Sequence, residues 1–265
     1  TYRALAPFAK VFYDTGDLHF VREERQAKLT GDARLLEIAQ WRKRQEFGIA
    51  AAVDCTIVVS EAERRILLDE RPELKIEVIS AVHDIAQSPA PFAARRDVVF
   101  VGGYKHLPNV DAVTYFVREI WPLVRLALPG VRFLIVGSHP PAEFDALACE
   151  DIVVVGHIAD LEACLDGCRV SVNPLRFGAG VKGKIVSAMA AGLPGVGTSI
   201  AAEGMDLRDG EDFLVADAPR DFADAVVRLY KDESLWTRLA AGGLRVVEQR
   251  YSIRAGTERF RAALA

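Results

Sequence analysis

Apolar runs alternate with segments of helical hydrophobic spacing along most of the chain. Residues 98–101, 131–136 and 152–155 are short runs rich in Val, Ile and Phe, each followed by glycine, and such runs are typical of buried strands. Residues 109–128 instead repeat apolar side chains at helical spacing and stop at Pro129-Gly130. Strands that alternate with helices in this way predict an α/β fold built on a parallel sheet with right-handed crossovers.

The same alternation continues on both sides of this region. Toward the N-terminus, Ser60-x-x-Glu63 has the spacing of a capping box and predicts a helix start. A long helix is predicted over residues 21–53, with an interruption near Thr30-Gly31-Asp32. Further strands are predicted at 10–14, 54–59, 75–79, 169–173, 195–198 and 213–215, and further helices at 142–148, 161–168, 182–191, 219–230, 233–249 and 253–265.

Residues 86–96 are rich in Pro and Ala and lack periodicity, which makes them the best candidate for a linker. We therefore expect a partial N-terminal α/β domain over residues 1–88 and a Rossmann-like domain over residues 89–250. A C-terminal helix over residues 251–265 is expected to pack back on the N-terminal part. Because the chain starts in mid-pattern without Met, we expect a fragment of a longer protein.

Composition narrows the classes of function. Hydrophobic residues make up 51% of the 265 residues, enough for a core, and a net charge of −4 gives no general attraction to nucleic acid. No apolar run is long enough to span a bilayer and no signal peptide is evident, so we expect a cytoplasmic protein. The cluster Arg42-Lys43-Arg44 leaves peripheral contact with the inner membrane face as an alternative. The four cysteines match no zinc pattern, and we expect no metal site.

The most informative stretch joins the predicted strand 169–173 to the helix that follows. Gly178 and Gly180 lack Cβ atoms, so their backbone amides can approach an anion closely. The helix start adds N–H groups, and its dipole favours negative charge near Lys182. This pattern predicts a phosphate site, with a solvated loop between strand and helix as the alternative. The spacing Gly178-x-Gly180-x-x-Gly183 also matches the dinucleotide fingerprint, but that fingerprint belongs in the first βα turn of a domain.

Five segments occur in a characteristic order and spacing: FVGGYKHLPNVDAV (100–113), FLIVGS (133–138), VVGHIADL (154–161), PLRFGAGVKGKIVSAMAAGLPGVGT (174–198) and AAEGMDLRDGEDFLVADAP (201–219). Together they resemble the C-terminal donor-binding domain of GT-B glycosyltransferases, and most closely the retaining group called family 4, which builds bacterial polysaccharides and glycolipids. The resemblance implies a GT-B fold, in which residues 1–85 are the tail of the family's N-terminal domain.

The resemblance implies a retaining transfer of sugar from a nucleotide-diphosphate sugar, in the cleft between the two domains, to a glycan or lipid-linked acceptor. The donor would be a UDP- or GDP-sugar, and no cofactor is implied. Lys105 and Lys182 would stabilise the charge of the departing diphosphate without a metal, and Asp17 would act at the acceptor, with a helix N-cap as its alternative role. The substrate-binding positions implied are Gly102, Gly103, Gly156, His157, Ile158, Arg176, Gly178, Ala179, Gly180, Val181 and Ser187, with Gly156–Ile158 against the base.

The chain departs from the family pattern at several positions. The family carries two glutamates eight residues apart around the loop, where this chain has Ala179 and Ser187. A serine hydroxyl bonds a ribose more weakly than a carboxylate does. Gly195 and Gly197 also replace the β-branched residues usual in the next strand, which lowers its β propensity. Two alternatives therefore stay open: an NAD(P)-dependent Rossmann oxidoreductase, and a degenerate, non-catalytic domain that binds a nucleotide-sugar or a partner.

Overall fold

The computed structural model describes residues 8–85 and 90–264, which form two compact units. The first unit contains the residues up to Ala81, Phe177–Val181 and the residues from Gly256 on. The second unit contains Val82–Arg176 and Lys182–Ala255. The domain boundary predicted at residues 88 and 89 lies outside the described residues. No helix in the described part of the chain has both the length and the apolar composition needed to cross a membrane.

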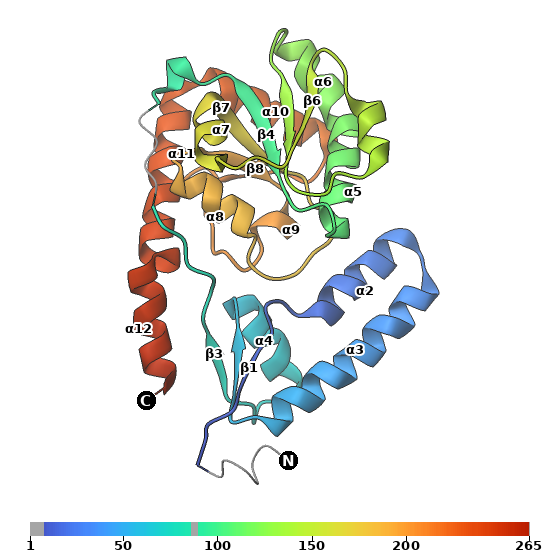
Figure 1. The fold of residues 1–265 in the computed structure, drawn as a ribbon, viewed down its shortest axis with the longest axis vertical. Helices are drawn as coiled ribbons and strands as arrows, with labels where there is room; N and C mark the ends of the chain where they lie inside the picture. The colour runs from blue at the N-terminus through green and yellow to red at the C-terminus, as the bar shows by residue number, and fades with distance from the viewer. Residues whose placement is uncertain (1–7, 86–89, 265) are drawn as a thin grey trace. The chain divides into compact units, whose positions relative to one another are not determined.

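The second unit is built on a six-stranded sheet with the order β6-β5-β4-β7-β8-β9. Figure 1 labels β4, β6, β7 and β8 among its strands. Neighbouring strands pair in parallel throughout, with Val98 opposite Phe133 and Ser171 opposite Gly195. The predicted parallel α/β sheet is confirmed, and its strand order is that of a doubly wound Rossmann-like sheet. The strands are β4 (Asp97–Val101), β5 (Phe133–Val136), β6 (Ile152–Gly156), β7 (Cys168–Asn173), β8 (Gly195–Gly197) and β9 (Leu214–Val215).

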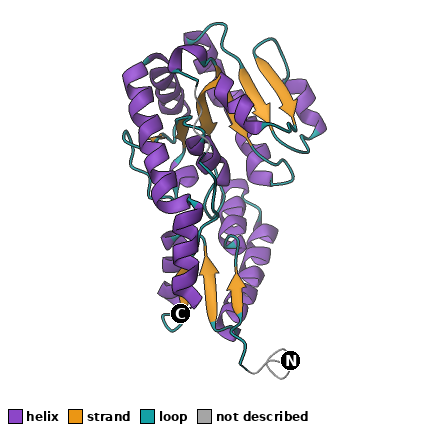
Figure 2. Cartoon of the chain, turned by 60° about the vertical axis from the view of Figure 1, so that its left-hand side comes forward, coloured by secondary structure: helices purple, strands orange, loops and turns teal. Residues whose placement is uncertain are grey.

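Helices cover both faces of this sheet (Figure 2). The strand β5 explains this arrangement, because it carries apolar residues on both faces. Its alternate residues point to opposite faces. Leu134 and Val136 share a buried cluster with residues of α7 (Leu161–Gly167) and α8 (Gly183–Ala190). On the other face the ring of Phe133 packs 4.6 Å from that of Phe116, measured between centroids. The aromatic cluster on this second face continues through Trp121 and, from α10 (Pro219–Lys231), Phe222.

The helix predicted over residues 109–128 is one continuous helical stretch with an internal irregularity. It consists of α5 (Leu107–Tyr115), the π-helical turn η2 (Phe116–Ile120) and α6 (Trp121–Ala127). α12 (Ile253–Leu264) begins in the second unit, and its residues from Gly256 on are grouped with the first unit. The remaining elements of the second unit are the 3-10 turns η1 (Phe92–Ala94) and η3 (Ala142–Leu147), α9 (Ser199–Ala202), α11 (Glu233–Val246) and the π-helical turn η4 (Val247–Tyr251).

The first unit contains a three-stranded parallel sheet and a helical hairpin. The interruption predicted near Thr30-Gly31-Asp32 in the helical stretch 21–53 is confirmed, because Gly31, with φ of 70°, ends the first helix and Asp32 caps the second. The capping box is confirmed as a helix start, since Oγ of Ser60 accepts the N–H of Glu63 at 3.2 Å. The elements are β1 (Phe12–Asp14), α2 (His19–Thr30), α3 (Ala33–Ala52), β2 (Cys55–Val58), α4 (Glu61–Glu70) and β3 (Ile76–Val78), with the strand order β1-β2-β3.

The glycines of β8 have a packing reason. A Cβ atom on Gly195 or on Gly197 would lie 2.8 Å from the ring of Phe213, which is itself buried. The aromatic ring therefore takes the space that β-branched side chains would fill on this strand. Burial of the ring offsets the low strand propensity of glycine.

Candidate functional site

The sheet of the second unit changes the direction of its crossovers between β4 and β7. The chain passes from β4 to β5 on one side of this point and from β7 to β8 on the other. In open parallel sheets, ligands bind at such a switch point, beyond the carboxyl ends of the strands. The loops there are residues 102–106, after β4, and residues 174–182, after β7. These are two of the loops that sequence analysis selected.

Three glycines are linked through backbone hydrogen bonds at this edge, and one of them, Gly137, has no room for a side chain. The N–H of Gly102 donates to the carbonyl of Val136 at 2.9 Å, and the N–H of Gly137 donates to that of Gly156 at 2.8 Å. A Cβ atom on Gly137, whose φ is 141°, would lie 2.7 Å from the carbonyl carbon of Gly102 and closer still to its oxygen. The predicted site residues Gly102 and Gly156 are therefore held by their neighbours' backbone, and Gly103 is exposed next to them.

α8 begins at the end of the second loop, with Lys182 as its N-cap. The carbonyl of Lys182 accepts the N–H groups of Ile185 at 2.8 Å and Val186 at 3.3 Å. The first N–H groups of an α-helix have no partner within the helix, and the dipole adds partial positive charge there. Lys182 is 7% exposed. A buried lysine is thus the N-cap of a helix whose start favours an anion.

Two further basic groups gather at this end of α8. The Nζ of Lys184 donates to Oδ1 of Asn109 and lies 4.4 Å from the ring centre of Phe100. Burial, and then the charge of Lys182, lowers the pKa of Lys184 to about 7. The imidazole of His83 lies beside Gly183, and burial lowers the pKa of His83 as well. The surroundings disfavour positive charge on these groups, and an anion at the start of α8 would favour it.

Lys105 and Arg176 lie on the two loops, and both are exposed. Arg176 forms a bidentate ion pair with Asp111, with its Nε 2.9 Å from Oδ2, and its guanidinium carbon lies 4.8 Å from the ring centre of Tyr115. The hydrogen bonds with Asp111 raise the pKa of Arg176. Arg176 is therefore held by the protein, whereas the structure shows no such partner for Lys105 within residues 8–85 and 90–264.

The residues predicted to meet the base and ribose belong to the same unit. His157 follows β6 and is exposed, while Ile158 packs against the buried cluster that includes Leu165. Ser187 lies in the middle of α8 and is partly buried. Nothing in the structure assigns these side chains a ligand, and their roles stay predictions.

The glycine loop is arranged differently from the prediction. Residues 177–181 are grouped with the first unit, where Nη1 of Arg25 donates to the carbonyl of Gly178 at 2.7 Å. A Cβ atom on Gly180 would lie 2.9 Å from that of Asp17, and Ala179 packs against the apolar cluster of that unit. Gly178 and Gly180 are both buried, and Val181 is partly buried. The glycines of this loop predict backbone amides that are open to an anion. The structure does not show this arrangement, because side chains of the first unit cover the loop.

Asp17 belongs to a cluster of charged groups in the first unit. It pairs with Arg22, and its Oδ1 lies 3.4 Å from Nδ1 of His19. Oε1 of Glu46, which is 4% exposed, lies 3.1 Å from the same nitrogen. Glu46 also accepts the N–H groups of His19 and Phe20 at 3.1 and 3.3 Å, so Glu46, and not Asp17, caps the start of α2. Burial raises the pKa of Glu46.

Sequence reasoning did not select Asn109, His83 and Glu46. Asn109 stands near the start of a helix, where Asn is an ordinary capping residue, so its type carried no signal. One signal was present in the chain: Lys182 and Lys184 stand two positions apart at a predicted helix start. Two lysines at a helix start need a polar neighbour that orients their ammonium groups. This requirement could have pointed to a residue such as Asn109.

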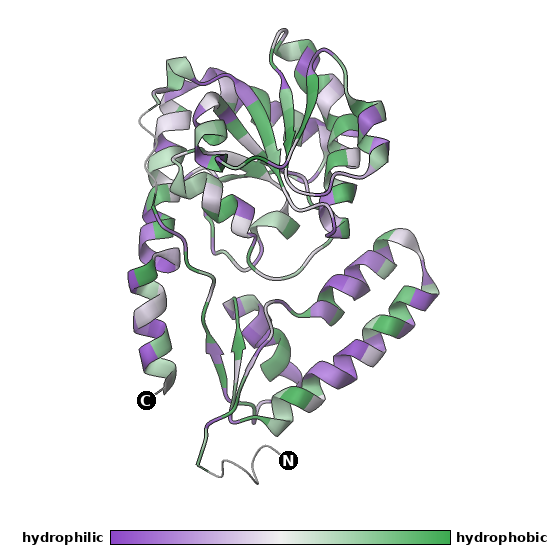
Figure 3. Ribbon diagram, in the orientation of Figure 1, coloured by the Kyte–Doolittle hydropathy of each residue, from purple (hydrophilic) through white to green (hydrophobic). Residues whose placement is uncertain are grey.

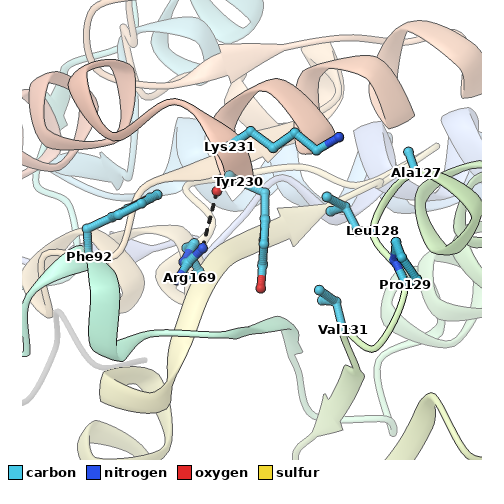
Figure 4. A pocket seen from close by; sticks show the side chains of 8 residues that line it. All are labelled: Phe92, Ala127, Leu128, Pro129, Val131, Arg169, Tyr230 and Lys231. Atoms are coloured by element: carbon cyan, nitrogen blue, oxygen red, sulfur yellow. Dashed lines mark hydrogen bonds between the residues drawn. The ribbon is translucent and has the colours of Figure 1, made fainter.

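A separate pocket of about 420 Å³ opens at the amino edge of the same sheet. Figure 4 shows Arg169 beside the rings of Phe92 and Tyr230, whose centres lie 4.2 and 4.5 Å from its guanidinium carbon. Its Nη1 donates to the carbonyl of Tyr230 at 3.5 Å, at the C-terminal end of α10. Arg169 thus completes the packing of a helix end, where a cation is favoured. The predicted site residues are not in the lining, whose other members are Ala127, Leu128, Pro129, Val131 and Lys231.

Comparison with known proteins places this geometry in a family. A model of the family described as glycosyl transferases group 1 matches residues 95–232. A curated relative, an uncharacterized 44.6 kDa protein in the cps region of Klebsiella pneumoniae, is 25% identical over 164 residues. The match covers 58% of this chain and 42% of the relative, so the chain spans less than half the length of that protein.

Solved glycosyltransferase structures share the fold. Sucrose-phosphate synthase from Thermosynechococcus elongatus is 17% identical with a TM-score of 0.78, over 99% of this chain and 69% of that one. HepE from Anabaena, in complex with UDP and glucose, is 17% identical with a TM-score of 0.73, over 99% and 73%. The expected GT-B fold is confirmed, and the family match favours glycosyl transfer over the oxidoreductase alternative. Because that match includes the sheet, both loops of the switch point and the start of α8, the chain belongs to the glycosyl transferases group 1 family.

Proposed function

We propose that this chain carries the donor site of a retaining glycosyltransferase, which takes a sugar from a nucleotide-diphosphate sugar and passes it to a glycan or lipid-linked acceptor. One observation carries the proposal: Lys182 and Lys184 stand at the start of α8, with His83 beside Gly183, at the switch point of a parallel sheet. Burial lowers the pKa of Lys184 to about 7, so the folded chain disfavours its positive charge, and a multivalent anion beside it would favour that charge. A diphosphate is such an anion.

The chemistry follows from the position of these charges. Transfer breaks the bond between the anomeric carbon and a diphosphate oxygen, and the nucleoside diphosphate leaves with the electron pair. Lys182, Lys184 and the N-terminus of α8 supply positive charge where this negative charge grows. Lys105, exposed on the neighbouring loop, is proposed to reach the same phosphates. Groups that are already fixed in place stabilise the growing charge without having to reorganise.

The nucleotide side of the proposal uses the residues after β6 and within α8. Gly156, His157 and Ile158 are proposed to lie against the base, and Ser187 to bond the ribose where relatives carry glutamate. HepE was solved with UDP and glucose, which makes UDP the first probe. The relative from a cps region supports a role in polysaccharide biosynthesis.

On the acceptor side we propose that Asp17 acts through His19. The carboxylates of Asp17 and Glu46 both face Nδ1 of His19. Two acceptors at this nitrogen favour the tautomer with its proton on Nδ1, which leaves Nε2 as the basic nitrogen. A nitrogen held in this way can accept the proton of an acceptor hydroxyl. The contact of Gly180 with Asp17 brings the family's glycine loop to the same place.

The donor proposal is tested by titrating UDP and uridine into the chain and its Lys182→Ala and Lys184→Met variants by calorimetry. We expect each variant to lose about tenfold or more in UDP affinity and less than about twofold in uridine affinity, because only UDP carries the diphosphate. Lys231→Met is the matched control, since this lysine lies at the amino edge of the sheet. Equal losses for UDP and uridine, or no loss for UDP, would contradict the phosphate role.

We also propose that the first unit contacts an anionic membrane surface through α3. Ile38, Trp41 and Ile49 lie along one side of this helix and are 45, 51 and 44% exposed. Figure 3 shows hydrophobic and hydrophilic residues mixed along α3. The guanidinium of Arg42 lies 5.6 Å from the ring centre of Trp41, and Arg34 stands on the same side. An exposed apolar stripe with adjacent cations is suited to the interface of anionic lipids.

The membrane proposal is tested by co-sedimentation with vesicles. We expect binding to vesicles that contain phosphatidylglycerol and weaker binding to pure phosphatidylcholine, because exposed Arg34 supplies an attraction that the ion pair of Arg42 with Glu23 does not cancel. Trp41→Ser should reduce binding to the anionic vesicles. Leu126→Ser, which changes an exposed leucine of the second unit, is the control and should leave it unchanged. Binding that is insensitive to Trp41→Ser would refute the contact through α3.

A further inference from the structure

Asn109 joins the turn after β4 to the first turn of α8. It is the third residue of α5 and is 5% exposed. Its Nδ2 donates to the carbonyl of Gly103 at 2.8 Å, and its Oδ1 accepts from Nζ of Lys184. These partners fix the orientation of the amide, because an ammonium group only donates and a backbone carbonyl only accepts.

The place of Asn109 depends on the missing side chain of Gly102. A Cβ atom there would lie 2.9 Å from both Cγ and Nδ2 of Asn109, and 3.0 Å from Cε1 of Phe100. A larger residue would therefore push the amide away from Lys184. The glycine turn after β4 has a second role beyond close approach of a ligand, because it makes room for the residue that holds the lysine.

Lys184 is held without a counter-charge. Its two neighbours, the amide of Asn109 and the ring of Phe100, are both uncharged. In the described part of the chain no carboxylate lies within ion-pair distance of Lys184. The titratable groups of the surrounding elements are Lys105 and His106 on the turn after β4, Asp111 on α5 in its pair with Arg176, His83 beside Gly183, and Lys182, whose charge acts on Lys184.

We propose that Asn109 is a positioning residue of the diphosphate site, which holds the ammonium group of Lys184 with a neutral acceptor so that its charge stays available to the phosphates. The inference rests on the proposed donor function. An aspartate in this place would hold Lys184 as firmly, but it would cancel the charge and repel the diphosphate. The amide also ties the turn after β4 to α8, so this turn and the start of α8 keep one spacing.

The test compares the 265-residue chain with its Asn109→Asp and Asn109→Leu variants. Asn109→Asp keeps an oxygen toward Lys184 and adds a charge, whereas Asn109→Leu removes both hydrogen bonds at similar volume. Gln40→Glu adds the same charge at an exposed position of α3 and is the control. We expect UDP affinity to fall about tenfold or more in both Asn109 variants and to stay within about twofold in the control, with uridine affinity within about twofold throughout.

A second measurement follows Lys184 itself, which a merely structural role of Asn109 would not change. NMR titration of the lysine side chains without ligand should show a higher pKa of Lys184 in Asn109→Asp, because a carboxylate favours the charged form. Calorimetry in buffers of different ionisation enthalpy should show proton uptake when the unsubstituted chain binds UDP near neutral pH. Asn109→Asp should lose this uptake.

The outcomes separate the two proposals. A pKa of Lys184 that is unchanged in Asn109→Asp would overturn the contact, and UDP affinity that survives both substitutions would overturn the positioning role. If the unsubstituted chain bound UDP no better than uridine, the donor function would fail and this inference with it. If UDP binding depended on Lys184 but not on Asn109, the donor function would stand and the inference would fall alone. Circular dichroism confirms that each variant is folded before it is titrated.

Discussion

The α-carbon of Gly137 faces the carbonyl group of Gly102, across the carboxyl edge of the sheet. Its φ of 141° and the 2.7 Å between a built Cβ atom and the carbonyl carbon of Gly102 leave no room for any side chain. The carbonyl of Gly102 belongs to the turn after β4, which also contains Gly103, and the carbonyl of Gly103 accepts from Nδ2 of Asn109. The edge of the sheet that carries the candidate site thus contains a close contact between two residues that have no side chain.

Gly137→Ala should therefore destabilise the chain severely. We expect a loss of about 2 kcal/mol or more in the free energy of unfolding, from backbone strain and steric clash together. Urea denaturation followed by circular dichroism measures it. Gly103→Ala is the matched control on the same edge, because the closest atom to its Cβ would be Oγ of Ser138 at 3.7 Å, and it should cost less than about 1 kcal/mol. Similar losses for both substitutions would contradict the close contact.

Phe213 and Gly197 should behave as a coupled pair. A Cβ atom on Gly197 would lie 2.8 and 2.9 Å from two ring atoms of Phe213, so Gly197→Val should cost about 1–3 kcal/mol by overpacking. Phe213→Ala should cost about 3–5 kcal/mol through lost burial and a cavity. In the double variant the valine can enter the vacated space, so the combined loss should be smaller than the sum by about 1 kcal/mol or more. Strictly additive losses, measured by urea denaturation, would show that the ring does not explain the glycines.

The stability of the chain should depend on pH through Lys184. Its pKa in the folded state is about 7, below its ordinary value of 10.5, so between these values the unfolded state binds more protons than the folded state. The free-energy penalty for burying the charged lysine is fully present below pH 7. It decreases as the pH rises from 7 to 10.5 and is absent at higher pH. Lys184→Met removes the penalty, and its stability gain over the unsubstituted chain should shrink from pH 7 to pH 10. A gain that is constant with pH would contradict the lowered pKa.

Glu46 should matter for the helix that it caps. Glu46→Ala leaves the N–H groups of His19 and Phe20 without their acceptor and should cost about 1–3 kcal/mol of stability. Glu46→Gln keeps one acceptor oxygen and should cost less. Glu37→Gln changes an exposed glutamate of the same helix and should have an effect within about 0.5 kcal/mol. Thermal or urea unfolding ranks the three variants, and the opposite ranking of Ala and Gln would refute the capping role.

The elements of the fold were largely readable from local patterns. Strands such as Val98–Val101 and the capping box at Ser60 follow from hydrophobic runs and from hydrogen bonds between near neighbours, which the sequence displays directly. The two loops of the switch point were also recognisable, because glycine after a strand marks a place where backbone must come close. The interruption near Thr30-Gly31-Asp32 was readable as well, and it is confirmed because Gly31 takes a left-handed conformation and ends the first helix.

By itself the sequence determined the alternation of strands and helices, the family resemblance and the cationic character of the start of α8, because each of these depends on residues that are close along the chain. Only the tertiary structure decided that Asn109 holds Lys184, 75 positions away. It also decided that Arg25 and Asp17 cover the glycine loop, although 153 positions separate Arg25 from Gly178. The physical reason is that such contacts are set by the order of strands in a sheet and by where a segment finds its packing partners. A residue's type and its neighbours in sequence do not carry that information.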